Sequence, residues 1–94
     1  MIIRVDIDGT ITETIDGDYE NSKPIQENID KINKLYNSGE TIIYWTARGS
    51  STSPDNWTEL TKTQLKKWGC KYHELRLDKP HYDLIIDDKS KRIE

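Results

Sequence analysis

The sequence is poor in the residues from which disulfide frameworks, metal–thiolate cages and large aromatic cores are built. Its 94 residues include a single cysteine, two histidines and no phenylalanine. One cysteine excludes both an intramolecular disulfide and a thiolate metal cage, so a reducing, cytoplasmic setting is expected. Because only 33% of the residues are apolar, the core must be thin and must depend on isoleucine, leucine, tryptophan and tyrosine.

Long apolar runs and dense basic clusters are also missing. Arg4 and Asp6 interrupt the first apolar run, and no later segment approaches the length of a membrane span. Lysine and arginine total 14 against 17 acidic residues, for a net charge of −3, and nucleic-acid binding requires the opposite balance. Neither a membrane nor a nucleic acid is therefore an expected partner, and the length predicts one domain over residues 1–94.

Short apolar runs alternate with amphipathic stretches along the chain. An Asp16-Gly17 pair predicts a hairpin turn inside a small flap at about residues 11–20. The alternation predicts an α/β fold with a mostly parallel sheet of about four strands and flanking helices. The expected strands lie at 1–7, 41–45, 72–77 and 83–86, and the expected helices run from Pro24 to Gly39 and from Pro54 to Gly69.

Acidic residues occur where the first and last of these strands end. Asp6 and Asp8 follow the first strand, and Asp87 and Asp88 follow the fourth. Open α/β sheets bind ligands at this edge, and if the two strands are neighbours their carboxylates converge. Two like charges about 4 Å apart repel by roughly 4 kcal/mol at an effective dielectric constant of about 20. A divalent cation would remove this repulsion, and oxygen-only ligands favour Mg²⁺ with a substrate phosphate.

A metal and a phosphate ester would give the neighbouring side chains roles in phosphoryl transfer. A carboxylate can act as a covalent nucleophile and form an aspartyl-phosphate. Asp8 could protonate the leaving oxygen and later deprotonate the attacking water, while Thr46 and Lys79 could stabilise the phosphoryl oxygens. Gly9 would let the chain turn beneath the phosphate with no Cβ in the way.

Four short motifs resemble those of the haloacid dehalogenase (HAD) superfamily and occur in that family's order. They are DIDGT, the TAR that ends the second strand, the lysine of DKP, and IIDD. The resemblance implies a three-layer, Rossmann-like sheet with Asp6 as the nucleophile and Asp8 as the general acid and base. It implies Thr46 and Lys79 as the hydroxyl and the lysine of the second and third motifs.

The same resemblance implies the ligands of the metal and of the substrate. Mg²⁺ would be held by the carboxylate of Asp6, by the backbone carbonyl of Asp8 and by a fourth-motif acid, Asp87 or Asp88. The substrate would be a phosphomonoester such as a sugar phosphate or a nucleotide. The motif residues expected to bind it are Gly9, Thr10, Ala47 and Arg48.

The sequence departs from most HAD members because no cap domain is inserted after the first motif or before the third. Without a cap the site should be open to solvent. The combination of DxDGT, TAR, KP and IDD is also similar to small capless members of the capsule or polysaccharide biosynthesis type. The family's usual fifth strand is also missing before Glu94. The fourth strand is therefore expected to be an exposed edge on which a second copy could pair as a homodimer.

Other interpretations remain open from the sequence alone. Asp6 and Asp8 could be ordinary turn acids at a strand end, and Arg48 fits a substrate-orienting residue and a surface salt bridge equally well. A phospho-receiver also combines an acidic pair, a threonine, a lysine and a phosphorylated aspartate, although in a different chain order. Besides a phosphohydrolase and a phospho-receiver, the third possible class of function is a catalytically weak module that docks to a partner.

Overall fold

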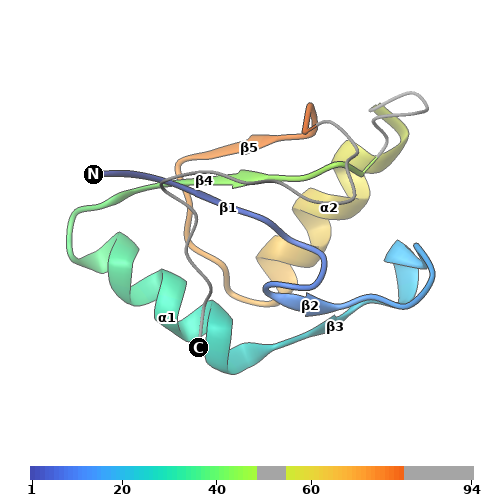
Figure 1. The fold of residues 1–94 in the computed structure, drawn as a ribbon, viewed down its shortest axis with the longest axis horizontal. Coiled ribbons are helices and arrows are strands. Elements are labelled where there is room, and N and C mark those ends of the chain that lie inside the picture. Colours follow the sequence, from blue (N-terminus) through green and yellow to red (C-terminus); the bar gives the residue numbers. More distant parts are fainter. Residues whose placement is uncertain (49–54, 80–94) are drawn as a thin grey trace, which may run out of the picture.

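In a computed structural model of the protein, which describes residues 1–48 and 55–79, three parallel strands form a sheet with two helices packed on it. The sheet order is β1-β4-β5 (Figure 1). The strands are β1 (Ile2–Val5), β4 (Thr41–Trp45) and β5 (Glu74–Arg76). The predicted α/β class and parallel pairing are therefore confirmed.

The strand boundaries agree best with the prediction at the centre of the sheet. The five residues of β4 are those expected, and it pairs with β1 on one side and β5 on the other. Both neighbours are shorter than predicted. Asp6 and Ile7 leave β1 to begin a turn, and β5 covers only Glu74–Arg76, although the N–H of His73 still donates to the carbonyl of Ile42 at 2.9 Å. The expected fourth strand at 83–86, with the edge proposed for a homodimer, lies outside the described residues.

The helices are α1 (Gln26–Asn37) and α2 (Asp55–Lys67). Helix α1 ends at the predicted glycine, since Gly39 has φ +97° and the amide of Glu40 donates to the carbonyl of Leu35 at 3.1 Å. Its predicted start at Pro24 is wrong by two residues. Pro24 instead pairs with Thr12 in a short strand, where its missing N–H is tolerated because the strand is an edge.

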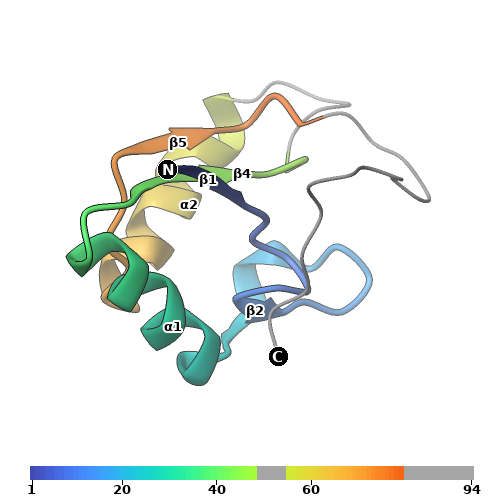
Figure 2. The same cartoon turned by 60° about the vertical axis from the view of Figure 1, so that its left-hand side comes forward.

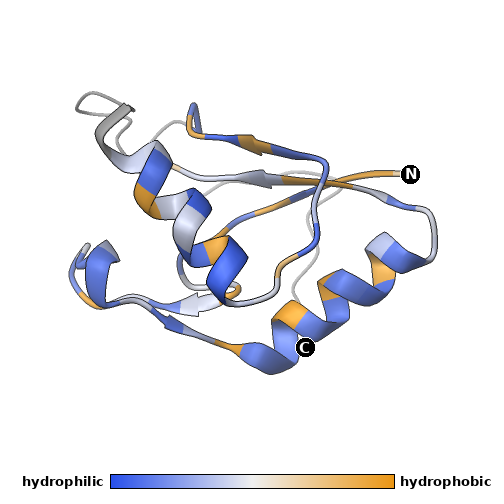
Figure 3. Ribbon diagram, turned by 180° about the vertical axis from the view of Figure 1, so that it is seen from behind, coloured by the Kyte–Doolittle hydropathy of each residue, from blue (hydrophilic) through white to orange (hydrophobic). Residues whose placement is uncertain are grey.

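One face of the sheet carries the core. Val5, Ile42 and Tyr44 point to this face, and Ile29 and Ile32 of α1 and Leu65 of α2 belong to the same buried cluster. Both helices therefore lie on one face (Figure 2), so the described residues form two layers and not the three that were predicted. Hydrophilic residues cover much of both helices on their outer sides (Figure 3). No helix of this part of the chain is long and apolar enough to cross a membrane.

A flap follows β1. Its two short strands, β2 (Thr12–Glu13) and β3 (Lys23–Pro24), pair antiparallel, and a 3₁₀ turn, η1 (Tyr19–Asn21), lies between them. The predicted hairpin turn is present, because Asp16 and Gly17 both have positive φ, +51° and +72°. The flap extends to residue 24, beyond the predicted end near residue 20, since β3 and not a helix closes it.

Candidate active site

Asp6 and Lys79 form an ion pair at the carboxyl edge of the sheet. Asp6 follows β1 directly, and its Oδ1 lies 3.4 Å from Nζ of Lys79. The backbone N–H of Lys79 donates to the carbonyl of Thr46 at 3.2 Å, and its ammonium lies 5.6 Å from the ring centre of Trp45. The loop after β5 thus brings residues from opposite ends of the chain together, as the sequence predicted.

The carboxyl group of Asp6 is partly removed from water. Its Oδ1 also accepts a hydrogen bond from the N–H of Ile7 at 3.0 Å. Burial raises the pKa of Asp6 above its ordinary value of 3.8, while the charge of Lys79 acts in the opposite direction. Among the described residues, Oδ2 of Asp6 accepts no hydrogen bond, so this oxygen is open to a metal ion or an electrophile.

The pKa of Asp6 supports a titration test on the metal-free protein. The carboxyl of Asp6 is expected to titrate above 3.8, and Lys79→Met should move this pKa further upward because the variant removes the cation that lowers it. Carboxyl ¹³C chemical shifts in excess chelator measure both values. Arg76→Met, at an exposed cation paired with Asp78, is the control. An Asp6 pKa that is unchanged in Lys79→Met would contradict the ion pair.

Thr46 directly follows β4, beside this pair. The residue is only 1% exposed, and its backbone N–H donates to the carbonyl of Arg76 at 2.9 Å. Its hydroxyl oxygen accepts the N–H of Arg48 at 3.2 Å, which leaves the hydroxyl hydrogen to donate elsewhere. Among the described residues, the N–H groups of Asp8 and Ala47 also meet no acceptor. The edge therefore presents three donors suited to an anion.

Gly9 and Thr10 use their amides inside the turn. The N–H of Gly9 donates to the carbonyl of Thr12 at 2.9 Å, and that of Thr10 donates to Ile7 at 3.1 Å. Gly9 has φ +84°, whereas a Cβ built on it would meet no described atom within 4 Å. The left-handed backbone therefore requires glycine here, and room for a phosphate above the turn stays a prediction. Neither amide is available to a substrate in this conformation.

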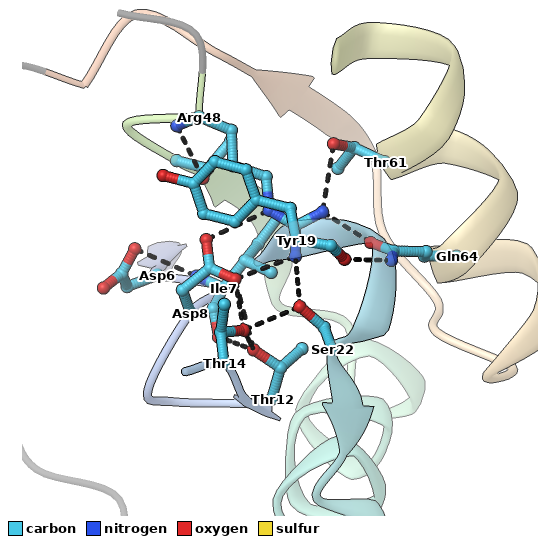
Figure 4. Close-up of polar contacts among 11 residues, drawn as sticks. Asp6, Ile7, Asp8, Thr12, Thr14, Tyr19, Ser22, Arg48, Thr61 and Gln64 are labelled. Atoms are coloured by element: carbon cyan, nitrogen blue, oxygen red, sulfur yellow. Dashed lines mark hydrogen bonds and ion pairs between the residues drawn. The ribbon is translucent and has the colours of Figure 1, made fainter. Parts of the chain in front are cut away.

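Asp8 is bound on both oxygens by Arg48. The Nε of Arg48 donates to Oδ2 at 3.0 Å and Nη2 donates to Oδ1 at 2.8 Å (Figure 4), which is the two-point geometry that a guanidinium favours. Flap hydroxyls complete the surroundings, since Thr14 donates to Oδ1 at 2.8 Å and Thr12 at 3.3 Å. The side chain of Asp8 is 24% exposed, whereas that of Arg48 is 0% exposed. Arg48 is thus not the surface residue that one interpretation of the sequence allowed.

Several residues of this network were not predicted from the sequence. They lie in the flap and on α2, and they are Thr14, Tyr19, Ser22, Thr61 and Gln64. One indication was present, because Thr61 and Gln64 share the helical stripe of Trp57 and Trp68 and so place two polar residues on an apolar face. Both are buried, and a buried polar stripe implies partners inside the protein.

The described residues supply only part of the predicted metal site. Asp87 and Asp88 lie outside them, and within 1–48 and 55–79 no three His, Cys, Asp or Glu side chains are grouped as metal ligands. Asp6 offers a carboxylate oxygen that accepts no hydrogen bond within these ranges, which suits a hard cation. The carboxylate of Asp8 is less suited, because Arg48 binds both of its oxygens.

Together the fold and this cluster define a small α/β protein with an anion-suited site at the carboxyl ends of its parallel strands. No protein-family model and no curated protein matches the chain. The chain is similar to the crystal structure of a structural-genomics (MCSG) target from Vibrio cholerae, with a TM-score of 0.80 and 29% sequence identity over 97% of this chain and 82% of that one. This similarity supports the α/β fold of the described residues.

Proposed function

We propose that the protein is a magnesium-dependent phosphohydrolase of the HAD type that cleaves a phosphomonoester through a phosphorylated Asp6. The observation that carries the proposal is the 3.4 Å contact between Asp6 and Lys79 at the carboxyl edge of the sheet. An ion pair with a purely structural role would also explain the contact between Asp6 and Lys79. It would not account for the Asp6 oxygen and the donors of Asp8, Thr46 and Ala47 around the same edge, which have no partner within residues 1–48 and 55–79.

In the proposed reaction Asp6 attacks the phosphorus atom through its open oxygen. An Asp6 oxygen–phosphorus bond forms and the bond from phosphorus to the leaving oxygen breaks, while Asp8 gives that oxygen a proton. Asp8 then takes a proton from a water molecule that attacks the phosphorus atom. The acyl phosphate bond breaks, phosphate leaves and Asp6 is restored. Lys79, the Thr46 hydroxyl and the backbone amides of Asp8 and Ala47 stabilise the charge on the phosphoryl oxygens.

The residues proposed to hold Mg²⁺ are Asp6, the backbone carbonyl of Asp8, and Asp87 or Asp88. When bound, the ion would neutralise charge on the phosphoryl group. The oxygen-only donor set suits magnesium, which prefers one or two carboxylates together with a substrate phosphate. Lys79 balances part of the charge of Asp6 when the metal is absent.

Phosphate release should depend on magnesium. We expect hydrolysis of an aryl phosphate in MgCl₂ and a loss of about 10²-fold or more in excess chelator, since a metal ion supplies several kcal/mol of transition-state stabilisation and each 1.36 kcal/mol is worth tenfold. Adding Mg²⁺ back should restore the rate. A screen of sugar phosphates, nucleotides and phosphoacids under the same conditions identifies the substrate class.

Two outcomes of that screen would contradict the proposal. No phosphate release from any ester, with or without magnesium, would favour a module that docks to a partner. A phosphoryl group that stays on Asp6 for minutes without turnover would instead favour a phospho-receiver. Both differ from the expected result, in which phosphate accumulates continuously.

A further inference from the structure

Arg48 is a buried cation with every donor in use. Its Nη1 donates to Oγ1 of Thr61 at 3.2 Å and to Oε1 of Gln64. Its Nη2 donates to Oγ of Ser22 at 3.4 Å in addition to Asp8. With Nε also on Asp8, all five N–H groups of the guanidinium have partners within the protein. No donor remains for a substrate, so any effect of Arg48 on catalysis must act through another residue.

The contacts of Arg48 join three separate parts of the chain. Asp8 lies in the turn after β1, Ser22 lies in the flap, and Thr61 and Gln64 lie on α2 (Figure 4). A buried guanidinium is costly unless its donors are satisfied. The arrangement is therefore stable only when the flap and α2 are both in place around Asp8.

The flap is attached to α2 at the same point. The carbonyl of Tyr19 accepts a hydrogen bond from Nε2 of Gln64 at 2.6 Å, and the Tyr19 ring lies 4.9 Å from Cζ of Arg48. The Tyr19 ring also meets Trp57 of α2 edge to face, with 5.2 Å between ring centroids. Thr14 of the flap also donates to Asp8. The flap therefore contacts the Asp8 carboxylate directly through Thr14 and indirectly through Arg48.

We propose that Arg48 is a positioning residue that couples docking of the flap on α2 to the orientation of the Asp8 carboxylate. This inference rests on the proposed function, in which Asp8 transfers the proton to the leaving oxygen. A planar fork that binds both carboxylate oxygens sets the plane of the carboxyl group. The N–H groups of the guanidinium that do not donate to Asp8 donate to Ser22 of the flap and to Thr61 and Gln64 of α2, so the flap and α2 fix the orientation of the guanidinium. An undocked flap would therefore leave Asp8 without a defined orientation.

Proton transfer from Asp8 matters most when the leaving group is poor. An activated aryl oxide departs without help, whereas an alkoxide such as that of a sugar phosphate needs a proton as it leaves. A residue that orients Asp8 should therefore affect alkyl phosphates more than aryl phosphates. A residue that only stabilises the fold should affect both equally.

The test compares wild type with Arg48→Lys on an alkyl phosphate and on a nitrophenyl phosphate in MgCl₂. Lysine keeps the charge but cannot bind both oxygens of Asp8. We expect kcat/KM on the alkyl ester to fall at least about tenfold more than kcat/KM on the aryl ester, within the 10²–10⁴-fold contribution of general acid catalysis. The comparison uses kcat/KM because this constant reports departure of the leaving group, whereas the later attack of water, in which Asp8 acts as a base, is common to both esters. Arg4→Lys is the matched control, because Arg4 is exposed and meets only the Trp45 ring among the described residues.

A second variant weakens the attachment of the flap to α2 without changing Asp8 or its hydrogen bonds to Arg48. Gln64→Met removes an acceptor of Arg48 and the donor to Tyr19. It should show the same selective loss, and the amides of Asn21 and Ser22, which donate within the flap, should exchange with deuterium faster than in wild type. Because Gln64→Met keeps the Arg48–Asp8 pair, it still tests the positioning role if Arg48→Lys does not fold.

The outcomes separate the inference from the function on which it rests. Equal losses on the two esters, or unchanged flap exchange in Gln64→Met, would overturn the positioning role while leaving the phosphohydrolase intact. A wild-type protein inactive on both esters would overturn the proposed function itself. A selective loss with faster flap exchange supports the inference.

Discussion

Replacing Asp6 with asparagine is expected to lower phosphate release by about 10³-fold or more, as loss of a covalent nucleophile does in other enzymes. The amide is similar in size and can still accept a hydrogen bond from Ile7, but it is uncharged and a poor nucleophile. The variant should remain folded. Burial raises the pKa of Asp6, so the ionised carboxylate opposes folding at neutral pH and its removal does not weaken the core.

The measurement is steady-state phosphate release together with the Tm of each protein at pH 7. Asp30→Asn is the matched control, because Asp30 is exposed on α1 and, within the described part of the chain, accepts a side-chain hydrogen bond from Gln26 alone. Acid quenching during turnover should trap a phosphoryl group on wild type, and peptide mass analysis should place it on Asp6. Phosphate release at the wild-type rate by Asp6→Asn would disprove the assignment of Asp6 as the nucleophile. A trapped phosphoryl group on another residue would disprove it as well.

The parts of the fold that the sequence predicted are those governed by local chemistry. The run at 41–45 is apolar and β-branched, so it predicts a buried strand, and the Asp16-Gly17 pair predicts a turn with positive φ. Both are present. The start of α1 was misplaced because Pro24 is equally suited to a first helical turn and to an edge strand. Its pairing with Thr12, twelve residues earlier, decides between the two.

The candidate site was predictable where it depends on strand ends. Asp6, Thr46 and Lys79 follow strands or strand-like runs, and parallel strands bring such positions to one edge. The surroundings of Arg48 were not predictable in the same way. Its partners are 40, 26 and 13 residues away in sequence, and their distances depend on how the flap and α2 pack. Sequence alone therefore left Arg48 between two roles, neither of which was a buried junction.

The second large effect is expected in stability when the Arg48–Asp8 pair is broken. Arg48→Met fills the buried space with an apolar chain but leaves a carboxylate that is 24% exposed without its cation. Removing one partner of a buried pair costs about 3–5 kcal/mol. We expect a value near the lower end, because Asp8 reaches some solvent and keeps the hydroxyls of Thr12 and Thr14.

A loss of this size is large for a chain of 94 residues, since folded domains have a total stability of about 5–15 kcal/mol. At about 4–8 °C per kcal/mol, a 3 kcal/mol loss lowers Tm by about 12–24 °C. Thermal and urea unfolding of the metal-free protein measure it, with Lys62→Met on the exposed face of α2 as the control for removing a cation.

A double-mutant cycle separates the ion pair from simple packing. Asp8→Asn alone leaves a fully buried guanidinium facing a neutral amide, so it should also destabilise the protein. Arg48→Met combined with Asp8→Asn removes both charges, and the double variant should be more stable than the sum of the single losses predicts, by about 1–3 kcal/mol. Additive losses would mean that Arg48 acts through its volume and its contacts to α2, in which case the two-point contact with Asp8 would contribute nothing to holding the flap in place.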